Sequence, residues 1–341
     1  MRVMTEKGEA LSFDTRRMLS WIDRIFGSDV DKVHAIGQRA LYNLVLNNRS
    51  TTSLLERSIE QCFNPFRHRI LESHFSVLTK VLNSFEDYQL PFWKVLGALI
   101  FVLGNDKGEV RVQSARLLQL LERRRDENSG IQDFDINISD RTTAVYKQAA
   151  YDISARLSRT HQELTFHIFS LFCKHFRSVD KDVQRQMVFS ILPWVQVIEL
   201  QIDTNDKPTP QSSMVLANLL EITFKTSSLL HNEVQALWQA LATGHPGNVQ
   251  LVLDFVISLC SERKDQAVVF YAKQVIVYMA HGAAGAKVVE FLLLKITPKN
   301  MVFSHKESLP LAGDGGGLPY LADLAETLPN VNRTVSVTVM R

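Results

Sequence analysis

The strongest constraint on this chain is a succession of apolar stripes at helical spacing across residues 11–296, joined by links of only a few residues. An apolar side chain at every third or fourth position is typical of an amphipathic helix. Short links place consecutive helices antiparallel. The pattern predicts helices over residues 11–26, 31–46, 51–62, 67–84, 91–103, 108–125, 141–157, 161–176, 180–199, 211–226, 230–243, 247–260, 265–280 and 284–296.

The spacing of these helices predicts a repeat architecture. About fourteen helices in some 285 residues amount to one helix pair per about 40 residues, which is the period of HEAT and armadillo arrays. One helix pair cannot bury its apolar face alone, so stacked neighbours share a continuous core. We therefore predict an all-α fold, a HEAT- or armadillo-like α-solenoid of about seven antiparallel helix pairs.

Residues 98–121 show the repeat-like order most clearly. An apolar helix ends at Gly104, Asp106 is placed to cap the next helix, and Val110 with Arg111 opens its first turns. This order resembles the HEAT consensus. At the start of the array, the apolar pattern predicts Ser12 as an N-cap and Gly27 as the residue that stops the first helix.

Glycine and proline are scarce, with 15 Gly and 10 Pro in 341 residues. That is about 7% where average usage gives about 12%. An all-β sandwich needs frequent turns and a dinucleotide-binding fold needs glycine-rich loops, so the scarcity argues against both. Residues 301–341 hold a disproportionate share, with 4 Gly and 3 Pro.

This uneven distribution predicts the domain organisation. We expect a helical-repeat array over residues 1–303, with candidate sub-divisions near 126–140 and 202–210, where the sequence is polar or proline-rich. Residues 304–341 are predicted to form a Gly/Pro-rich linker and a disordered or non-native tail. The glycines of residues 313–317 lack the Lys-Ser/Thr of a phosphate-binding loop, so they predict a flexible linker.

Charge and cysteine usage narrow the class of partner. The net charge of +2, from 38 basic and 36 acidic residues, gives no electrostatic footprint for nucleic acid or an anionic membrane. Three cysteines far apart in sequence predict reduced, buried thiols.

The first ten residues lack the apolar stretch of a signal peptide, and the longest apolar run is about half a membrane crossing. We expect a cytoplasmic protein without membrane insertion.

Common catalytic motifs do not occur in the sequence, including the metalloprotease, serine-hydrolase, P-loop and di-iron patterns. We therefore predict that the chain is not an enzyme and has no catalytic, cofactor-binding or metal-binding residues. A helical enzyme with an unrecognised site is left as a minor alternative. One partial match is to a calcium loop, whose first ligand positions would be Asp133, Asp135, Asn137 and Ser139. The match fails because Ile138 replaces the required glycine and Ala144 the bidentate glutamate.

Two groups of histidine and cysteine could be read as metal ligands. They are His167, Cys173 and His175, and Cys62 with His68 and His74. Neither spacing matches a standard zinc pattern and each lacks a fourth ligand, so both predict structural roles.

Arginines and tryptophans are the remaining candidate binding residues. The arginine run 123–125 ends a predicted helix, where the helix dipole stabilises cations. We expect these arginines to lie in solvent. The alternative is that they bind an acidic partner. Trp21, Trp93, Trp194 and Trp238 each stand among apolar residues, which predicts core packing rather than exposed anchors.

Five stretches of the sequence resemble the Furry family of cell-morphogenesis proteins, and most of all its fungal branch. The longest, residues 229–260, reads LLHNEVQALWQALATGHPGNVQLVLDFVISLC. The other four are residues 86–93, 131–147, 192–201 and 287–298. The similarity extends over about residues 15–303, is seen again at residues 318–324 (LPYLADL), and stops after Pro329.

The resemblance implies more than the residues do alone. Members of this family are very large helical-repeat proteins that act as scaffolds for an NDR-type kinase and its Mob coactivator during polarised growth. It implies a location at the cell cortex and growth sites, and contacts with microtubules or cortical proteins. No catalytic residue is implied, and the partner-binding residues are unknown. The alternative is a generic HEAT-repeat adaptor in transport or in the regulation of small GTPases, since one fold serves many functions.

Overall fold

The computed structural model describes residues 2–4, 10–12, 14–48, 52–63, 68–85, 88, 90–125, 137–204 and 207–296. The chain divides into two compact units, one of residues 1–156 and 174–190, the other of residues 157–173 and 191–341. The division between a repeat array over residues 1–303 and a tail over residues 304–341 stays a prediction, because residues 297–341 lie outside the described part.

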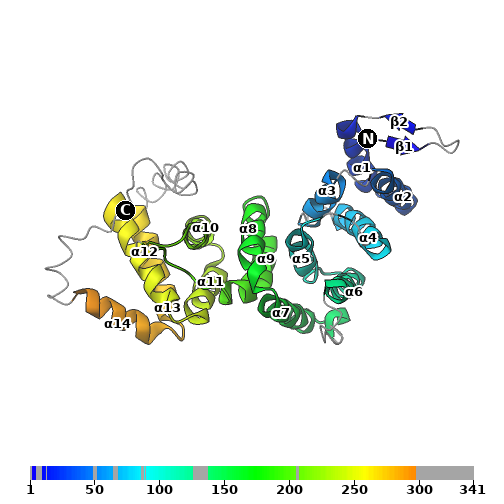
Figure 1. Ribbon diagram of the computed structural model, residues 1–341. Coiled ribbons are helices and arrows are strands. Elements are labelled where there is room, and N and C mark those ends of the chain that lie inside the picture. Colours follow the sequence, from blue (N-terminus) through cyan, green and yellow to red (C-terminus); the bar gives the residue numbers. More distant parts are fainter. Residues whose placement is uncertain are drawn as a thin grey trace. The chain divides into compact units, whose positions relative to one another are not determined.

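The first unit begins with a β-hairpin and continues as helices (Figure 1). Strands β1 (Arg2–Met4) and β2 (Ala10–Ser12) pair antiparallel, with Val3 opposite Leu11. The helices wholly inside this unit are α1 (Thr15–Phe26), α2 (Asp31–Asn47), α3 (Ser53–Cys62), α4 (His68–Ser84), α5 (Phe92–Val102), α6 (Gly108–Arg125) and the short η2 (Asn137–Ser139).

The second unit contains a corresponding series of helices (Figure 1). It comprises η3 (Gln162–Leu164), α10 (Pro210–Thr226), α11 (His231–Gly244), α12 (Asn248–Arg263), α13 (Gln266–Ala280) and α14 (Gly285–Ile296). Three further helices contribute residues to both units: α7 (Thr143–Thr160), α8 (Thr165–Phe176) and α9 (Lys181–Gln196).

Within each unit the helices pack against others close to them in sequence, mostly the next helix or the one after it. In the first unit α4 packs against α2, α3 and α6, and α5 packs against α3 and α6. In the second unit α13 packs against α11, α12 and α14. This is the arrangement of stacked helix pairs that share one core. The all-α helical-repeat prediction is confirmed, and the described helices number fourteen, as the periodicity predicts.

One predicted helix start is wrong. Residues 10–12 belong to β2, so the first helix starts at Thr15 rather than at residue 11. The cap is Asp14, whose Oδ1 accepts a hydrogen bond of 3.0 Å from the Arg17 amide, rather than Ser12. Pairing of Ser12 with Arg2 in the hairpin removes it from the helix. The predicted stop at Gly27 is confirmed.

Two residues that the apolar pattern places in the core are exposed: Trp21, named above, and Ile36, which falls on the apolar stripe of the helix predicted over residues 31–46. The Trp21 side chain is 57% exposed and the Ile36 side chain 66% exposed. On α2 the buried stripe runs through His34, Gly37 and Leu41, one position away from the stripe predicted through Ile36. Trp194 and Trp238, by contrast, have no exposed surface, which confirms their core prediction.

No helix among the described residues combines the length and apolarity needed to span a bilayer.

Candidate interaction surface

A buried arginine closes the turn between α5 and α6. Arg111 is only 1% exposed, and its guanidinium donates to four carbonyl oxygens. The acceptors are Ile138 at 2.6 Å, Asn105 at 2.7 Å, Asp106 at 2.9 Å and Asp140 at 2.5 Å. A buried cation is stable only when its donors are satisfied. Arg111 therefore fastens the segment around η2 to the first turn of α6, and its role is structural.

The surroundings of Arg111 complete this node. Its guanidinium lies 3.7 Å from the centroid of the Tyr146 ring, which is a favourable cation–π distance. The Tyr146 hydroxyl donates to Asp106 Oδ1 at 3.2 Å. Asp140 Oδ1 accepts from the Thr142 amide at 2.6 Å and so caps the start of α7. Burial, together with the nearby Asp106 carboxylate, raises the pKa of the Tyr146 hydroxyl.

In the second unit a buried asparagine likewise holds backbone segments together. Asn248 has no exposed surface. Its Nδ2 donates to the carbonyls of Ile198 at 2.8 Å and Leu241 at 2.7 Å, while its Oδ1 accepts from the Leu200 amide at 2.9 Å. All three contacts are to backbone groups, so Asn248 fixes the linker after α9 against α11 and α12.

A buried polar cluster joins α1, α3 and α4. Arg57 forms an ion pair with Asp23, and His74 Nε2 lies 3.8 Å from Asp23 Oδ1. His74 Nδ1 lies 3.1 Å from Ser58 Oγ. Burial alone would raise the pKa of the Asp23 carboxyl, but His74 and Arg57 outweigh it and the pKa is lowered. Burial lowers the pKa of His74 despite the opposing Asp23 charge.

This cluster contains the residue types of a hydrolase triad, yet its geometry does not suit catalysis. Ser58 has no exposed surface, and its hydroxyl also donates to the Leu54 carbonyl at 3.2 Å. A nucleophilic serine must be reachable by a substrate carbonyl. The Asp23, His74 and Ser58 side chains therefore connect helices rather than form an active site. The sequence pattern did not reveal the cluster, because Asp23, Ser58 and His74 are 16 to 51 residues apart along the chain.

The candidate metal ligands are dispersed among structural roles. Among the described residues no group of three His, Cys, Asp or Glu side chains could hold a metal ion. His167 is exposed, whereas Cys173 is buried. Cys62 is buried, donates to the Ser58 carbonyl, and burial raises the pKa of its thiol to about 12. Asp133 and Asp135 of the calcium pattern lie outside the described residues, as do the glycines of residues 313–317.

His175 stacks on an aromatic ring instead of binding a ligand. Its ring centroid lies 4.4 Å from that of Phe63, with only 5° between the planes. Its Nε2 is buried and has no hydrogen-bond partner. Burial and the nearby Lys174 charge lower the pKa of His175 to about 4, so the ring is neutral at physiological pH.

The arginine run at the end of α6 differs partly from its prediction. Arg123 and Arg125 are exposed, but Arg124 is half-buried and reaches the C-terminus of α4. Its Nη1 donates to the Leu82 carbonyl at 2.5 Å, and its Nη2 to the Asn83 carbonyl at 3.2 Å. Cations at a helix C-terminus satisfy carbonyls that have no helical donor. Arg124 therefore caps a neighbouring helix instead of lying in solvent.

Helix α14 presents the most extensive exposed apolar face among the described residues. Only Val288 is buried, while α14 contacts α12 and α13. Lys295 Nζ lies 2.9 Å from Asp254 Oδ1 and ties α14 to α12. Four large side chains stay exposed: Val289 at 53%, Leu293 at 63%, Leu294 at 56% and Ile296 at 60%. Apolar residues occur on nearly all sides of α14, and among the described residues the face that carries these four side chains stays exposed.

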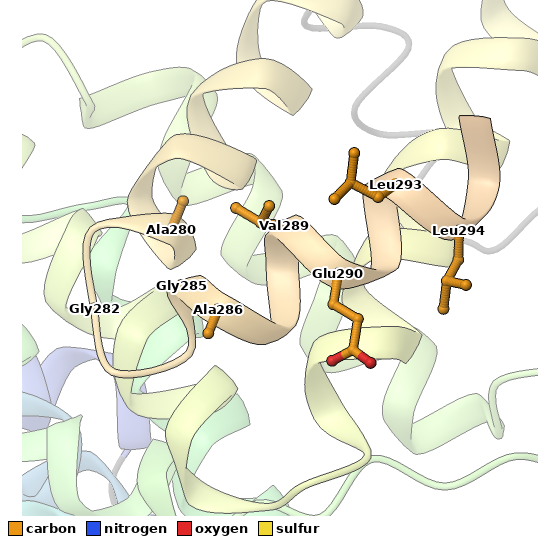
Figure 2. A pocket seen from close by; sticks show the side chains of 8 residues that line it. All are labelled: Ala280, Gly282, Gly285, Ala286, Val289, Glu290, Leu293 and Leu294. Atoms are coloured by element: carbon orange, nitrogen blue, oxygen red, sulfur yellow. The ribbon is translucent and has the colours of Figure 1, made fainter. Parts of the chain in front are cut away.

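The exposed side chains of α14 border a hollow of about 770 Å³ near the α13–α14 turn. Figure 2 shows Val289 and Leu293 on one side of α14, and Glu290 and Leu294 on the other. Ala280, at the end of α13, faces the Val289 side. Exposed apolar surface of this kind, rather than the buried polar nodes, is suited to binding another segment.

Comparison with known proteins decides the family. Residues 10–306 match the family described as "Cell morphogenesis central region". The chain belongs to this family. The resemblance to the cell-morphogenesis proteins of the fungal branch is thereby confirmed.

Two fungal relatives match nearly the whole chain. The chain is 25% identical over 327 residues to the cell polarity protein mor2 of Schizosaccharomyces pombe, which covers 95% of this chain and 15% of that protein. It is 27% identical over 325 residues to the cell morphogenesis protein PAG1 of Saccharomyces cerevisiae, which covers 93% of this chain and 13% of that protein. The chain thus spans about a seventh of the length of these relatives.

Proposed function

We propose that this chain is a non-enzymatic scaffold segment in cell morphogenesis and polarised growth. The observation that carries the proposal is the match of residues 10–306 to the central region of the cell-morphogenesis family. The names of the two fungal relatives, a cell polarity protein and a cell morphogenesis protein, support the same role.

The finer proposal is that the segment supports an NDR-type kinase and its Mob coactivator, in the cytoplasm at the cell cortex and sites of growth. The described helices support a binding role. Their buried polar groups, such as Arg111 and Asn248, hold backbone segments in place. Rigid elements that position a surface reduce the entropy lost on binding.

Capture by the tagged full chain tests this proposal. We expect the chain to retain a purified NDR-type kinase, its Mob coactivator, or their complex, in the absence of other proteins. As a matched control we use the full chain with Leu118→Asp, which is expected to unfold the first unit and leaves the tag unchanged. If neither kinase nor coactivator is retained, the segment is a spacer within a longer protein and the finer proposal is wrong.

If the chain is instead a small-GTPase adaptor, the same capture experiment should give a different result. A GTPase regulator would retain its partner in one nucleotide state and release it in the other, because GTPase switch segments are ordered by the γ-phosphate. Nucleotide-dependent retention without kinase retention would favour this alternative.

A further inference from the structure

We propose that the outer face of α1 is a docking surface for an acidic peptide segment of a partner protein. The surface consists of Arg16, Arg17, Trp21 and Arg24 and is called the α1 surface below. The ligand that it fits is an extended segment with carboxylates on either side of an apolar residue. This inference goes beyond the scaffold function, because it assigns one surface and one chemical class of ligand, whichever protein supplies that ligand.

Helix α1 has one side that packs and one side that faces solvent. Ile22 and Phe26 are 3% and 0% exposed, and α1 packs against α2 and α4. The single carboxylate within α1, Asp23, forms an ion pair with Arg57 of α3. The four residues of the α1 surface are all exposed. With 3.6 residues per turn they fall within about 140° of the helix circumference, so they form one continuous face.

Two of the arginines occupy unfavourable positions for a helix. Arg16 and Arg17 lie in the first turn of α1, which contains no acidic residue. The N-terminus of a helix carries a partial positive charge and favours acidic side chains. In the part of the chain that the structure describes, no carboxylate forms an ion pair with either of them or with Arg24. Residues that break a local rule without a compensating contact are expected at functional sites.

Trp21 provides the apolar centre of the α1 surface. It is 57% exposed, although tryptophan is on average a highly buried residue type. Arg17 precedes it by four residues and Arg24 follows it by three, so one arginine lies on each side of the indole along the same face. Tryptophan and arginine are enriched among the residues that dominate the binding energy of protein interfaces.

Charge complementarity selects an acidic ligand. Guanidinium groups bind carboxylates through two parallel hydrogen bonds. Arg17 and Arg24 are about 10 Å apart along the helix axis, because each residue rises about 1.5 Å. An extended peptide advances about 3.3 Å per residue, so carboxylates three residues apart can reach both arginines while the residues between them cover the indole.

A peptide fits this surface better than a lipid membrane does. Helices that lie in a membrane interface bury a broad apolar face in the lipid. Trp21 is the only large apolar side chain of α1 that is exposed, since Ile22 and Phe26 are used for packing within the first unit.

Fluorescence anisotropy with the full chain tests the docking. The probe is a labelled peptide, Gly-Glu-Glu-Pro-Leu-Glu-Glu-Gly, and the control peptide has glutamine in place of each glutamate. We expect saturable binding of the acidic peptide and none of the control. Exposed ion pairs are screened by salt, so binding should weaken by roughly tenfold between about 0.05 and 0.5 M salt. Absence of saturable binding of the acidic peptide would overturn the proposal.

Variants of the full chain separate docking from folding. Arg16→Glu with Arg17→Glu should weaken binding by roughly tenfold or more. Its melting temperature should stay the same or rise, because acidic side chains suit the first turn of a helix. Trp21→Ala should weaken binding by a similar factor. The matched control, Lys273→Glu with Lys287→Glu, makes the same change of charge at exposed positions of the second unit and should bind normally. Equal binding by all these proteins would contradict the proposal.

A sedimentation assay with vesicles of phosphatidylcholine and phosphatidylserine tests the other class of ligand. Retention of the chain on these vesicles without binding of the acidic peptide would assign the α1 surface to a membrane and overturn the proposal. Kinase capture can fail while the peptide binds, and can succeed while the peptide does not, so the two proposals are tested separately.

Discussion

Individual buried side chains hold the non-helical parts of this protein in place. Arg111 and Asn248 each bind backbone groups of the connections between α-helices. The sequence predicts that Arg111 opens a repeat helix but not what it binds, since its acceptors Ile138 and Asp140 lie beyond a long connection. Distant backbone carbonyls leave no residue-type signal, so such contacts require the structure.

Removal of the Arg111 side chain should be strongly destabilising. Arg111→Ala leaves four carbonyl oxygens without their charged donor, so we expect a loss of about 3 kcal/mol in the free energy of unfolding. Chemical denaturation followed by circular dichroism measures it. Arg116→Ala, at an exposed position on the same helix, should cost less than about 0.5 kcal/mol. Equal effects of the two substitutions would show that Arg111 is not the fastening residue.

The lowered pKa of His175 predicts acid sensitivity. In the folded protein its pKa is about 4, against an ordinary value of 6.5. The unfolded state therefore binds more protons between these values, and stability falls as the pH drops from about 6.5 towards 4.

A substitution isolates this contribution. His175→Phe keeps the stacking on Phe63 but cannot titrate, so it should reduce the stability lost between pH 7 and pH 5 by about 1 kcal/mol. Denaturation curves at the two pH values measure the difference. Gln113→Phe, at an exposed position that carries no titratable group, is the control and should leave the pH dependence unchanged. An unaltered pH profile for His175→Phe would mean that this ring is solvated in the folded state.

At the scale of helices, periodicity predicts most boundaries well. The predicted helix over 108–125 matches α6 (Gly108–Arg125), and the one over 284–296 differs from α14 by one residue. Errors arise where a tertiary contact outweighs a local signal. Both Ser12 and Asp14 are good caps, and only the hairpin shows which one is used. On α2, alternative apolar stripes occur, so periodicity alone cannot show that Ile36 faces solvent.

The register of α6 can be tested directly. Leu118 has no exposed surface, so Leu118→Asp would bury a carboxylate without a partner. We expect a loss of more than about 4 kcal/mol or failure of the first unit to fold, seen as a large decrease in melting temperature. Gln113→Asp is exposed on the same helix and should melt like the unsubstituted chain. Similar melting of both variants would disprove this register.

Close approach of two helices can be tested with a pair of glycines. A Cβ at Gly244 would overlap the Gln196 carbonyl oxygen, so α11 and α9 meet where only glycine fits. Gly244→Ala should cost about 2 kcal/mol in unfolding free energy. Gly247→Ala meets no atom within 4 Å and keeps an ordinary helical backbone, so it should be nearly neutral. A neutral Gly244→Ala would mean that these helices lie further apart.

At the scale of the whole molecule, the helical-repeat architecture predicted from the sequence agrees with the structure. The proposed function, in contrast, rests on family membership. Helix pairs that contact their neighbours and next neighbours support a repeat array. Fold alone does not select a partner, because such arrays serve many roles. The proposed role in cell morphogenesis rests instead on the family match and the two fungal relatives. The partner-binding residues could not be predicted, since exposed helix faces carry no motif of a fixed spacing.

The central proposal is that this segment is a scaffold that binds the kinase module directly. Isothermal titration of the purified full chain with a purified complex of NDR-type kinase and Mob coactivator tests it most directly. We predict saturable binding with a defined stoichiometry and a negative change in heat capacity, which marks burial of apolar surface. Absence of binding by a chain that circular dichroism shows to be folded and helical would contradict this account.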